Sequence, residues 1–269
     1  MNTRPIGIFD SGVGGLTVFK AVASALPRES FVYLGDTARV PYGTRSAETV
    51  VRYSLQAARF LRGHDVKMLI VACNTASSVA LDALAGELPI PVVGVILPGA
   101  RRAAQVSTAG RIGVIGTRAT VASGAYPPAI RARRPDAEVL SRACPLFVPL
   151  AEEGWVDHDV TRRVAEEYLA PLKSARVDTL VLGCTHYPLL RATLAAVMGS
   201  AVALVDSAEA VAEEVRERLR REPGLSAGDG ETSTHRFYVT DAPEPFTAVA
   251  ERFLGAPILR LERATLPES

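Results

Sequence analysis

The sequence is poor in cysteine and in lysine, with three residues of each. The cysteines form no CxxC pair and no cluster with histidine at metal-ligand spacing, which argues against a disulfide framework and against a zinc site. We therefore expect free thiols in a reducing cytoplasm and no bound metal.

The sequence also lacks an excess of charge of one sign and a long apolar run. Its 30 basic and 29 acidic residues leave a net charge of +1, so no global field recruits nucleic acid or an anionic membrane. No signal-peptide apolar region follows the amino terminus, and no apolar run approaches the ~20 residues of a membrane span. We expect a soluble, unexported protein whose partner is a small molecule.

The feature that stands out is a repeated cysteine motif. An apolar run over 69–72 leads into Cys73, and a second run over 180–183 leads into Cys184, 111 positions later (184 − 73). Such short runs are typical of buried parallel strands, and ligands of parallel sheets gather beyond the carboxyl ends of the strands. A lone cysteine in an apolar run is usually a small buried hydrophobe, but a matched pair favours a functional role.

The two halves of the chain mirror each other more widely. Residues 111–117 resemble 6–11 at an offset of 106 (112 − 6), and 202–206 take the place that 92–96 hold in the first half. This pattern predicts an α/β fold of two pseudo-symmetric lobes, each a mostly parallel sheet flanked by helices, with the active site in the cleft between them. The expected lobes are 1–97 together with 208–269, and 98–207.

The remaining elements follow from local patterns. Helical spacing of apolar residues predicts helices from after Leu16 to about residue 25, at 46–62, from about 159 to 173, from after Ser207 to about residue 221, and at 245–254. Apolar runs predict further strands at 31–34, 139–140, 237–239 and 258–261, and 145–150 is also strand-like. The stretch 223–234, rich in glycine, serine and acids, is expected to be a mobile loop, after which the chain returns to the first lobe.

Two thiols on opposite walls of a cleft suit one reaction in particular. A racemase removes a proton from one face of a carbon and returns a proton to the other face, so each member of an acid/base pair acts as base in one direction and as acid in the other. Cysteine fits this task because its reference pKa of about 8.5 is reachable near neutrality, and helix N-termini or neighbouring donors lower it further.

Polar residues beside the thiols are candidates for substrate binding. Asp10 can accept from an ammonium or orient a proton, and His186 could tune the second thiol. The neutral donors suited to a carboxylate at helix starts are Ser11, Asn74, Thr75 and Thr185. Asn74 and Thr75 can also cap the helix that follows them.

Two loops give weaker signals. Tyr42 and Gly43 could offer a hydroxyl and an unhindered backbone amide, but a simple Pro-Tyr-Gly turn explains the local sequence equally well. The glycine-rich turn at 12–15 could bring the backbone close to an anion. It does not match the GxGxxG dinucleotide fingerprint, and no P-loop lysine follows it.

Pyridoxal phosphate is the usual alternative for amino-acid racemisation, and it needs a lysine that forms a Schiff base. Only Lys20, Lys67 and Lys173 are present, and none lies in a glycine-rich or strand-end motif. We therefore expect no pyridoxal cofactor.

Taken together, the motifs resemble those of the bacterial glutamate racemases in the aspartate/glutamate racemase family, in the same order and over nearly the whole chain. They are GIFDSGVGGL at 7–16, GDT at 35–37, PYG at 41–43, ACNTAS at 72–77, VPLAEEG at 148–154 and GCTHYPL at 183–189. The resemblance implies an isomerase that interconverts L- and D-glutamate without cofactor or metal, supplying D-glutamate for peptidoglycan synthesis, cell-wall biogenesis and cell shape. It also implies a cytoplasmic protein with two lobes, and a homodimer.

The resemblance also assigns roles to residues. Cys73 and Cys184 would be the acid/base pair, assisted in proton transfer by Asp10, Glu152 and His186. Cys144 is expected to be structural. The substrate would be bound by Asp10, Ser11, Tyr42, Gly43, Asn74, Thr75, Thr185 and His186.

Three other functions stay open at this point. A racemase of aspartate or a related acid would share two lobes and two cysteines. A two-lobed protein could close on an anion without chemistry, although binding alone does not need a thiol at both strand ends. A redox pair would need the Cα atoms of Cys73 and Cys184 to lie within about 7 Å of each other. Two cavity walls that hold a substrate between them are farther apart than that.

Overall fold

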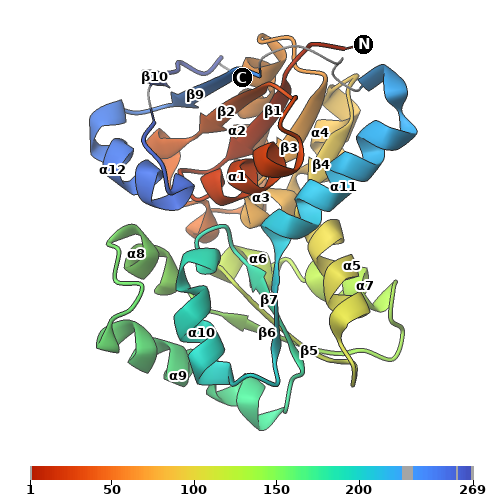
Figure 1. Ribbon diagram of the computed structural model, residues 1–269, viewed down its shortest axis with the longest axis vertical. Coiled ribbons are helices and arrows are strands. Elements are labelled where there is room, and N and C mark those ends of the chain that lie inside the picture. The colour runs from red at the N-terminus through yellow and green to blue at the C-terminus, as the bar shows by residue number, and fades with distance from the viewer. Residues whose placement is uncertain (1, 226–232, 259, 268–269) are drawn as a thin grey trace.

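The structure is a computed structural model that describes residues 2–225, 233–258 and 260–267. It contains two α/β lobes, one above the other along the long axis of the molecule (Figure 1). All strand pairings in both sheets are parallel, so the predicted fold class is confirmed. The limits expected for the two lobes stay a prediction. The expected mobile loop includes 226–232, which lie outside the described residues.

The first sheet has six strands in the order β10-β9-β2-β1-β3-β4. These strands are β1 (Ile6–Asp10), β2 (Phe31–Gly35), β3 (Met68–Val71), β4 (Val92–Gly94), β9 (His235–Val239) and β10 (Leu261–Arg263). The last two come from the end of the chain, and β9 pairs with β2 from Phe31 opposite His235 to Gly35 opposite Val239. The carboxyl-terminal segment thus completes the sheet whose β3 leads into Cys73.

The second sheet has four strands in the order β6-β5-β7-β8. They are β5 (Arg111–Gly116), β6 (Glu138–Ala143), β7 (Thr179–Gly183) and β8 (Ala203–Asp206). In this sheet β7 lies beside β5 as β3 lies beside β1 in the first, so Cys184 follows the strand equivalent to the one before Cys73. The repeat predicted from the sequence therefore corresponds to equivalent strand positions.

Helices connect the strands and cover the sheets (Figure 1). They are α1 (Leu16–Ala25), α2 (Ala47–Arg62), α3 (Asn74–Val79), α4 (Leu81–Glu87), α5 (Ile96–Val106), α6 (Arg118–Ala122), α7 (Tyr126–Arg131), α8 (Phe147–Glu152), α9 (Asp159–Ser174), α10 (Arg191–Met198), α11 (Ser207–Arg221) and α12 (Pro243–Leu254). Four short 3₁₀ turns lie at Thr37–Arg39, Tyr42–Thr44, Tyr187–Leu190 and Pro223–Leu225. The five predicted helices correspond to α1, α2, α9, α11 and α12, and their ends agree within about two residues.

Some predicted elements differ from the structure in type or in extent. The strand-like run at 145–150 is mostly the helix α8, because Pro149 cannot donate to a sheet ladder but is tolerated in the first turn of a helix. The strand at 92–96 ends at Gly94, and the next amide, of Val95, donates to the Ser77 hydroxyl instead of to a strand. Of the strand predicted at 258–261, Leu261 lies in β10, which continues to Arg263.

The core follows the two-residue period of the strands. Alternate residues of β1 and β3 enter a large apolar cluster that runs through both lobes, and the residues between them enter a second cluster on the opposite face. The first set is Ile6, Ile8, Met68 and Ile70, and the second is Phe9, Leu69 and Val71. Burial on both faces explains why these strands read as continuous apolar runs in the sequence.

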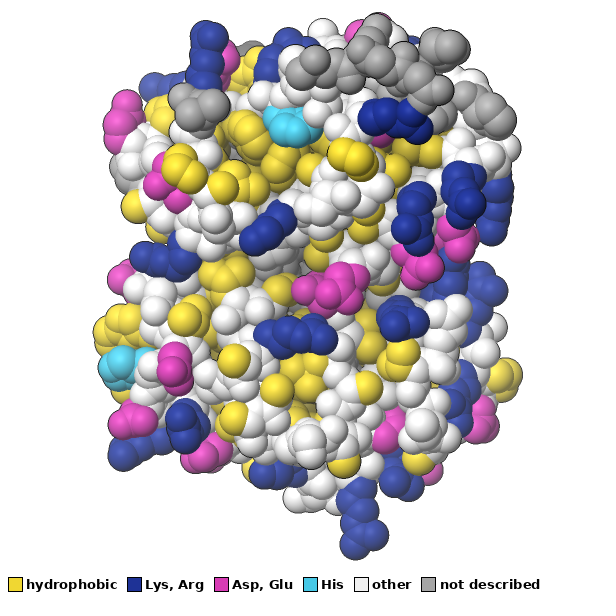
Figure 2. All heavy atoms as spheres, viewed as in Figure 1, with side chains coloured by type: hydrophobic (Ala, Val, Ile, Leu, Met, Phe, Trp, Pro, Cys, Tyr) yellow, Lys and Arg dark blue, Asp and Glu magenta, His cyan; other side chains and the backbone are white. Residues whose placement is uncertain are grey.

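The surface agrees with the balanced composition. Basic and acidic side chains are interspersed over the face shown in Figure 2, without a large area of one sign. Within the described residues, no helix has the length and apolar character needed to cross a membrane.

A buried ion pair closes the end of the first sheet that lies away from Cys73. Lys67 Nζ lies 2.5 Å from Glu29 Oε2 and donates to the Asn2 carbonyl at 2.9 Å, and both charged side chains are almost fully buried.

We expect Glu29→Gln to lower the free energy of unfolding by about 3 kcal/mol or more, because the lysine charge stays buried without its anion. Urea denaturation measures this loss. Arg59 and Glu87 form an exposed pair, and a Glu87→Gln control should cost under about 1 kcal/mol; equal losses would contradict the prediction.

Candidate active site

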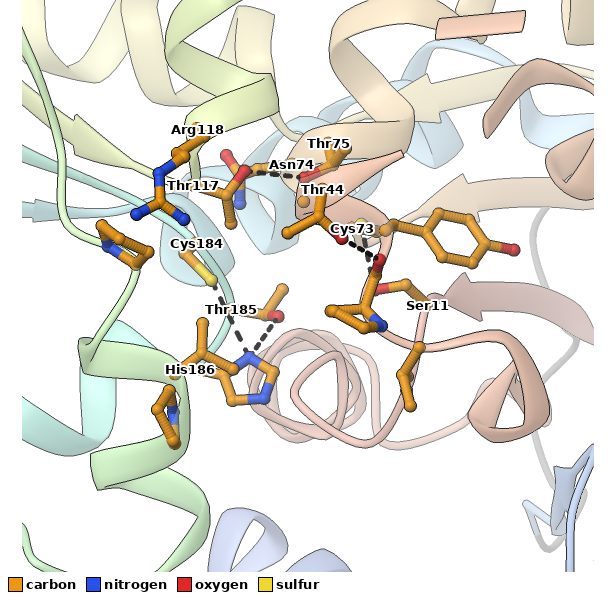
Figure 3. Close-up of a pocket in the computed structure, with 18 of the residues that line it drawn as sticks. Ser11, Thr44, Cys73, Asn74, Thr75, Thr117, Arg118, Cys184, Thr185 and His186 are labelled. Carbon is orange, nitrogen blue, oxygen red and sulfur yellow. Dashed lines mark hydrogen bonds between the residues drawn. The ribbon is translucent and has the colours of Figure 1, made fainter. Parts of the chain in front are cut away.

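Both cysteines at the strand ends line one cavity of about 340 Å³. Cys73 comes two residues after β3 and Cys184 directly after β7, and each side chain is buried except for a 6% exposed fraction. Within the described residues all three cysteines are free thiols, and Cys144 lies apart from the cavity in the hydrophobic core. Figure 3 shows the two sulfur-bearing side chains on opposite sides of the same space.

Cys73 sits at the start of a helix. Its sulfur accepts from the Ala76 amide at 3.5 Å and so caps α3, the place that the sequence suggested for Asn74 and Thr75. The thiol also hydrogen-bonds to the Ser11 hydroxyl at 3.3 Å. Burial raises the pKa of Cys73 to about 12, assisted by nearby Asp10 and opposed by the Ser11 and Ala76 hydrogen bonds. This cysteine is therefore a protonated thiol at neutral pH.

Cys184 has a different neighbour. Its sulfur lies 3.8 Å from His186 Nδ1, and the opposite ring nitrogen, Nε2, lies 2.8 Å from Glu152 Oε1. Although burial lowers the pKa of His186, its contacts with Cys184 and Glu152 outweigh that effect and raise the pKa to about 10. An imidazolium beside a cysteine is the arrangement that activates nucleophilic and basic thiols in enzymes. Glu152 thus joins the site through His186.

Asp10 lies behind the cavity wall, fully buried. One carboxylate oxygen accepts from the Gly12 amide at 2.9 Å, while the other has no hydrogen-bond partner within the described residues. Burial raises the pKa of Asp10, against the lowering effects of His186 and the surrounding backbone amides. A buried carboxyl with a free oxygen next to Cys73 and Ser11 can hold or relay a proton.

The glycine-rich turn at 12–15 allows the two lobes to pack closely against each other. A Cβ atom at Gly14 would lie 2.5 Å from the Thr185 hydroxyl and from the His186 ring, so only glycine lets this turn contact the second lobe. Gly43 has the same role on the other side of the cavity, where a Cβ would lie 2.8 Å from Thr117 Cβ. The weak anion-binding signal of the turn in the sequence thus has a packing explanation.

The hydroxyl of Tyr42, in the Pro-Tyr-Gly turn, forms a hydrogen bond within the first lobe. Tyr42 OH donates to Asp36 Oδ2, which also accepts from Arg39 Nε at 2.7 Å, while Thr240 donates to the other oxygen of Asp36 at 2.8 Å. Tyr42 and Gly43 therefore line the cavity, but the tyrosyl hydroxyl that the sequence suggested for a ligand is engaged by Asp36.

The sequence analysis missed several polar residues of the cavity and their hydrogen-bond partners. Thr117 and Thr120 of the second lobe form a triangle of hydroxyls with Thr75, with oxygen separations of 3.0 to 3.2 Å. The signal for Thr117 was present, because 111–117 mirrors 6–11 and Thr117 occupies the place of Ser11. Tyr126, which donates to Asn74 Oδ1 at 2.7 Å, and Arg118, the one lysine or arginine among the described cavity residues, had no recognisable signal.

Nearly all the predicted site residues come together. The cavity lining includes both cysteines and the residues Ser11, Tyr42, Gly43, Asn74, Thr75, Glu152, Thr185 and His186. Asp10 lies directly behind Ser11. Within the described residues, no group of three or more histidines, cysteines or carboxylates could hold a metal ion. The arrangement offers two acid/base thiols, neutral donors for carboxylates, and acids placed beside each thiol.

Comparisons with known proteins agree with this geometry. The family model "Asp/Glu/Hydantoin racemase" matches residues 6–215. A glutamate racemase of Geobacter metallireducens is 58% identical over 255 residues, which cover 95% of this chain and 94% of the relative. The crystal structure of a Bacillus anthracis glutamate racemase isoform is 40% identical, with a TM-score of 0.95 and complete coverage of both chains. That of the Francisella tularensis glutamate racemase in complex with D-glutamate is 39% identical, with a TM-score of 0.91 and 98% coverage of each chain. The chain belongs to the Asp/Glu/Hydantoin racemase family.

Proposed function

We propose that the protein is a cofactor-independent glutamate racemase that uses Cys73 and Cys184 as its two acid/base residues. The observation that carries the proposal is the presence of two thiols, from equivalent strand ends of two lobes, in one cavity. We take glutamate as the substrate because the relatives are glutamate racemases. They are up to 58% identical to this chain and cover nearly all of it.

The proposed reaction begins with the α-carbon of glutamate between the two sulfurs. One cysteine, as thiolate, removes the α-proton from its face, and the other, as thiol, donates its proton to the opposite face of the carbanion. The proton count of the pair is unchanged, and the two cysteines have exchanged roles. The reverse reaction uses the same residues in the opposite order, as microscopic reversibility requires.

The residues around the two thiols bind the substrate or assist proton transfer. Asn74, Thr75 and Thr185 supply neutral donors at the cavity wall, which suits them to the substrate carboxylates. Asp10 and Ser11 assist the Cys73 side, and the Glu152 and His186 pair assists the Cys184 side.

An aspartate racemase is the rival within the family, and a competition assay between the two amino acids separates them. A two-lobed binding protein is the rival outside enzymes; in that case cysteine variants would bind normally with no activity to lose.

We further propose that the protein works in the cytoplasm as a homodimer and supplies D-glutamate for peptidoglycan synthesis. Size-exclusion chromatography with light scattering tests the dimer.

Replacing either cysteine separates the two half-reactions. We expect Cys73→Ala and Cys184→Ala each to reduce racemisation by about 100-fold to 10,000-fold, since one acid/base group is lost. In D₂O each variant should still exchange the α-proton of one enantiomer, a different one for each variant, because the remaining thiol faces one side of the carbon. NMR of the α-proton measures the exchange. Cys144→Ala is the control, and unimpaired racemisation by either site variant would contradict the two-base assignment.

The pH dependence should show a loss of activity at alkaline pH. The His186 imidazolium beside Cys184 favours the thiolate, so kcat/KM should fall near pH 10, where His186 loses its proton. The two enantiomers have equal free energy, so kcat/KM must be the same in both directions at every pH.

Glu152 should set the position of the falling limb. Its carboxylate is one of the groups that raise the pKa of His186, so Glu152→Gln should move the fall in kcat/KM to lower pH. Steady-state rates between pH 6 and 11 measure the shift. The neighbouring exposed Glu153, changed to Gln, is a matched control that should leave the profile unchanged. An unmoved limb in the Glu152 variant would show that His186 is not the group that titrates there.

A further inference from the structure

In the side-chain amide of Asn74, the oxygen has a hydrogen-bond partner and the nitrogen has none within the described residues. The residue is 2% exposed, and its Oδ1 accepts from Tyr126 OH at 2.7 Å. Its Nδ2 is buried and has no hydrogen-bond partner within the described residues. Leaving such a buried donor unpaired is unfavourable, and Asn74 is part of the cavity wall (Figure 3). The nitrogen is therefore a donor that a bound acceptor would satisfy.

Tyr126 is the residue that holds this amide. It begins α7 in the second lobe, is 2% exposed, and is absent from the cavity lining. It therefore acts on the site through other residues and has no direct contact with a ligand there. Its hydroxyl reaches across to the first lobe, to the residue that directly follows Cys73.

The ring of Tyr126 is fixed by the chain next to the other cysteine. Gly183 directly precedes Cys184, and a Cβ atom there would lie 3.2 Å from Tyr126 Cε2. The same side chain closely approaches Gly99 of α5, where a Cβ would lie 3.6 Å from the hydroxyl oxygen. Tyr126 is thus packed against the backbone before one catalytic cysteine while it hydrogen-bonds the residue after the other.

We propose that Tyr126 is a positioning residue that holds the Asn74 side chain so that its Nδ2 donates to a substrate carboxylate. With the tyrosyl hydroxyl donating to Oδ1, the amide plane is fixed and the nitrogen is left for the ligand. Without the hydroxyl, the amide rotates freely about its last torsion angle and can turn its oxygen toward the carboxylate. The inference rests on the proposed function in taking a carboxylate as the ligand.

Tyr126→Phe removes the hydroxyl and keeps the ring against Gly183. We expect the KM for both glutamate enantiomers to rise by about fivefold or more, with kcat changed by less than about twofold, because the bond positions a binding group and not an acid or base. The control is Tyr168→Phe, which removes a tyrosyl hydroxyl from α9 whose partner is the Leu146 amide. A change in kcat alone, or KM values equal to those of the control, would overturn the proposal.

A double-mutant cycle tests whether the effect passes through Asn74. Once Asn74→Ala has removed the amide, adding Tyr126→Phe should raise KM no further, whereas a general structural role of Tyr126 would give additive losses and overturn the proposal. Asn74→Asp is a second probe in an otherwise intact chain. It keeps an acceptor for Tyr126 but places an oxygen where the nitrogen was, so it should weaken glutamate binding more than Asn74→Ala does.

Calorimetric titration with glutamate makes the inference independent of turnover. If wild type binds glutamate but does not racemise it, the proposed function fails, while a weaker binding by Tyr126→Phe than by Tyr168→Phe still supports the role of Tyr126. If wild type racemises glutamate and Tyr126→Phe binds it as tightly as the control does, the positioning role fails and the proposed function stands.

Discussion

The close contact between the two lobes at the glycine turn is the constraint on which the site depends. Two acid/base groups can serve opposite faces of one carbon only if separate parts of the chain hold them at a fixed separation. Gly14 permits that contact because it has no side chain to collide with Thr185 and His186. Thr17 adds a hydrogen bond from α1 to the Thr185 carbonyl at 3.1 Å. The packing that joins the lobes is therefore the same packing that positions the groups around Cys184.

The framework is nearly symmetric, but the surroundings of the two thiols are not. Cys73 caps a helix and lies near the buried Asp10, whereas Cys184 faces a histidine that is paired with Glu152. The substrate has no mirror symmetry of its own, since its ammonium, its carboxylate and its side chain must each find one place. An asymmetric set of neighbours around a symmetric pair of bases is what such a substrate requires.

The sequence predicted the features that repeat or alternate locally. The two parallel sheets followed from apolar runs, and most of the cavity followed from polar residues directly after strands or from the family resemblance. What failed depends on three-dimensional contacts. The cap of α3 is the Cys73 thiol, which only the geometry of the strand end shows. The Tyr42 hydroxyl is taken by Asp36, and the Tyr126 hydroxyl by Asn74, a residue 52 positions away, and neither partner can be identified from local sequence.

The pairing of β9 with β2 has a consequence for the order of assembly during synthesis. The second sheet uses a continuous part of the chain, from Arg111 to Asp206, so all its strands have been made before the chain is complete. The first sheet instead joins Phe31 to His235, a separation of 204 residues, and Thr240 then reaches Asp36 beneath the Tyr42 turn. Contacts of such long range are the slowest to form in folding. The lobe that is begun first on the ribosome is therefore the one that is finished last.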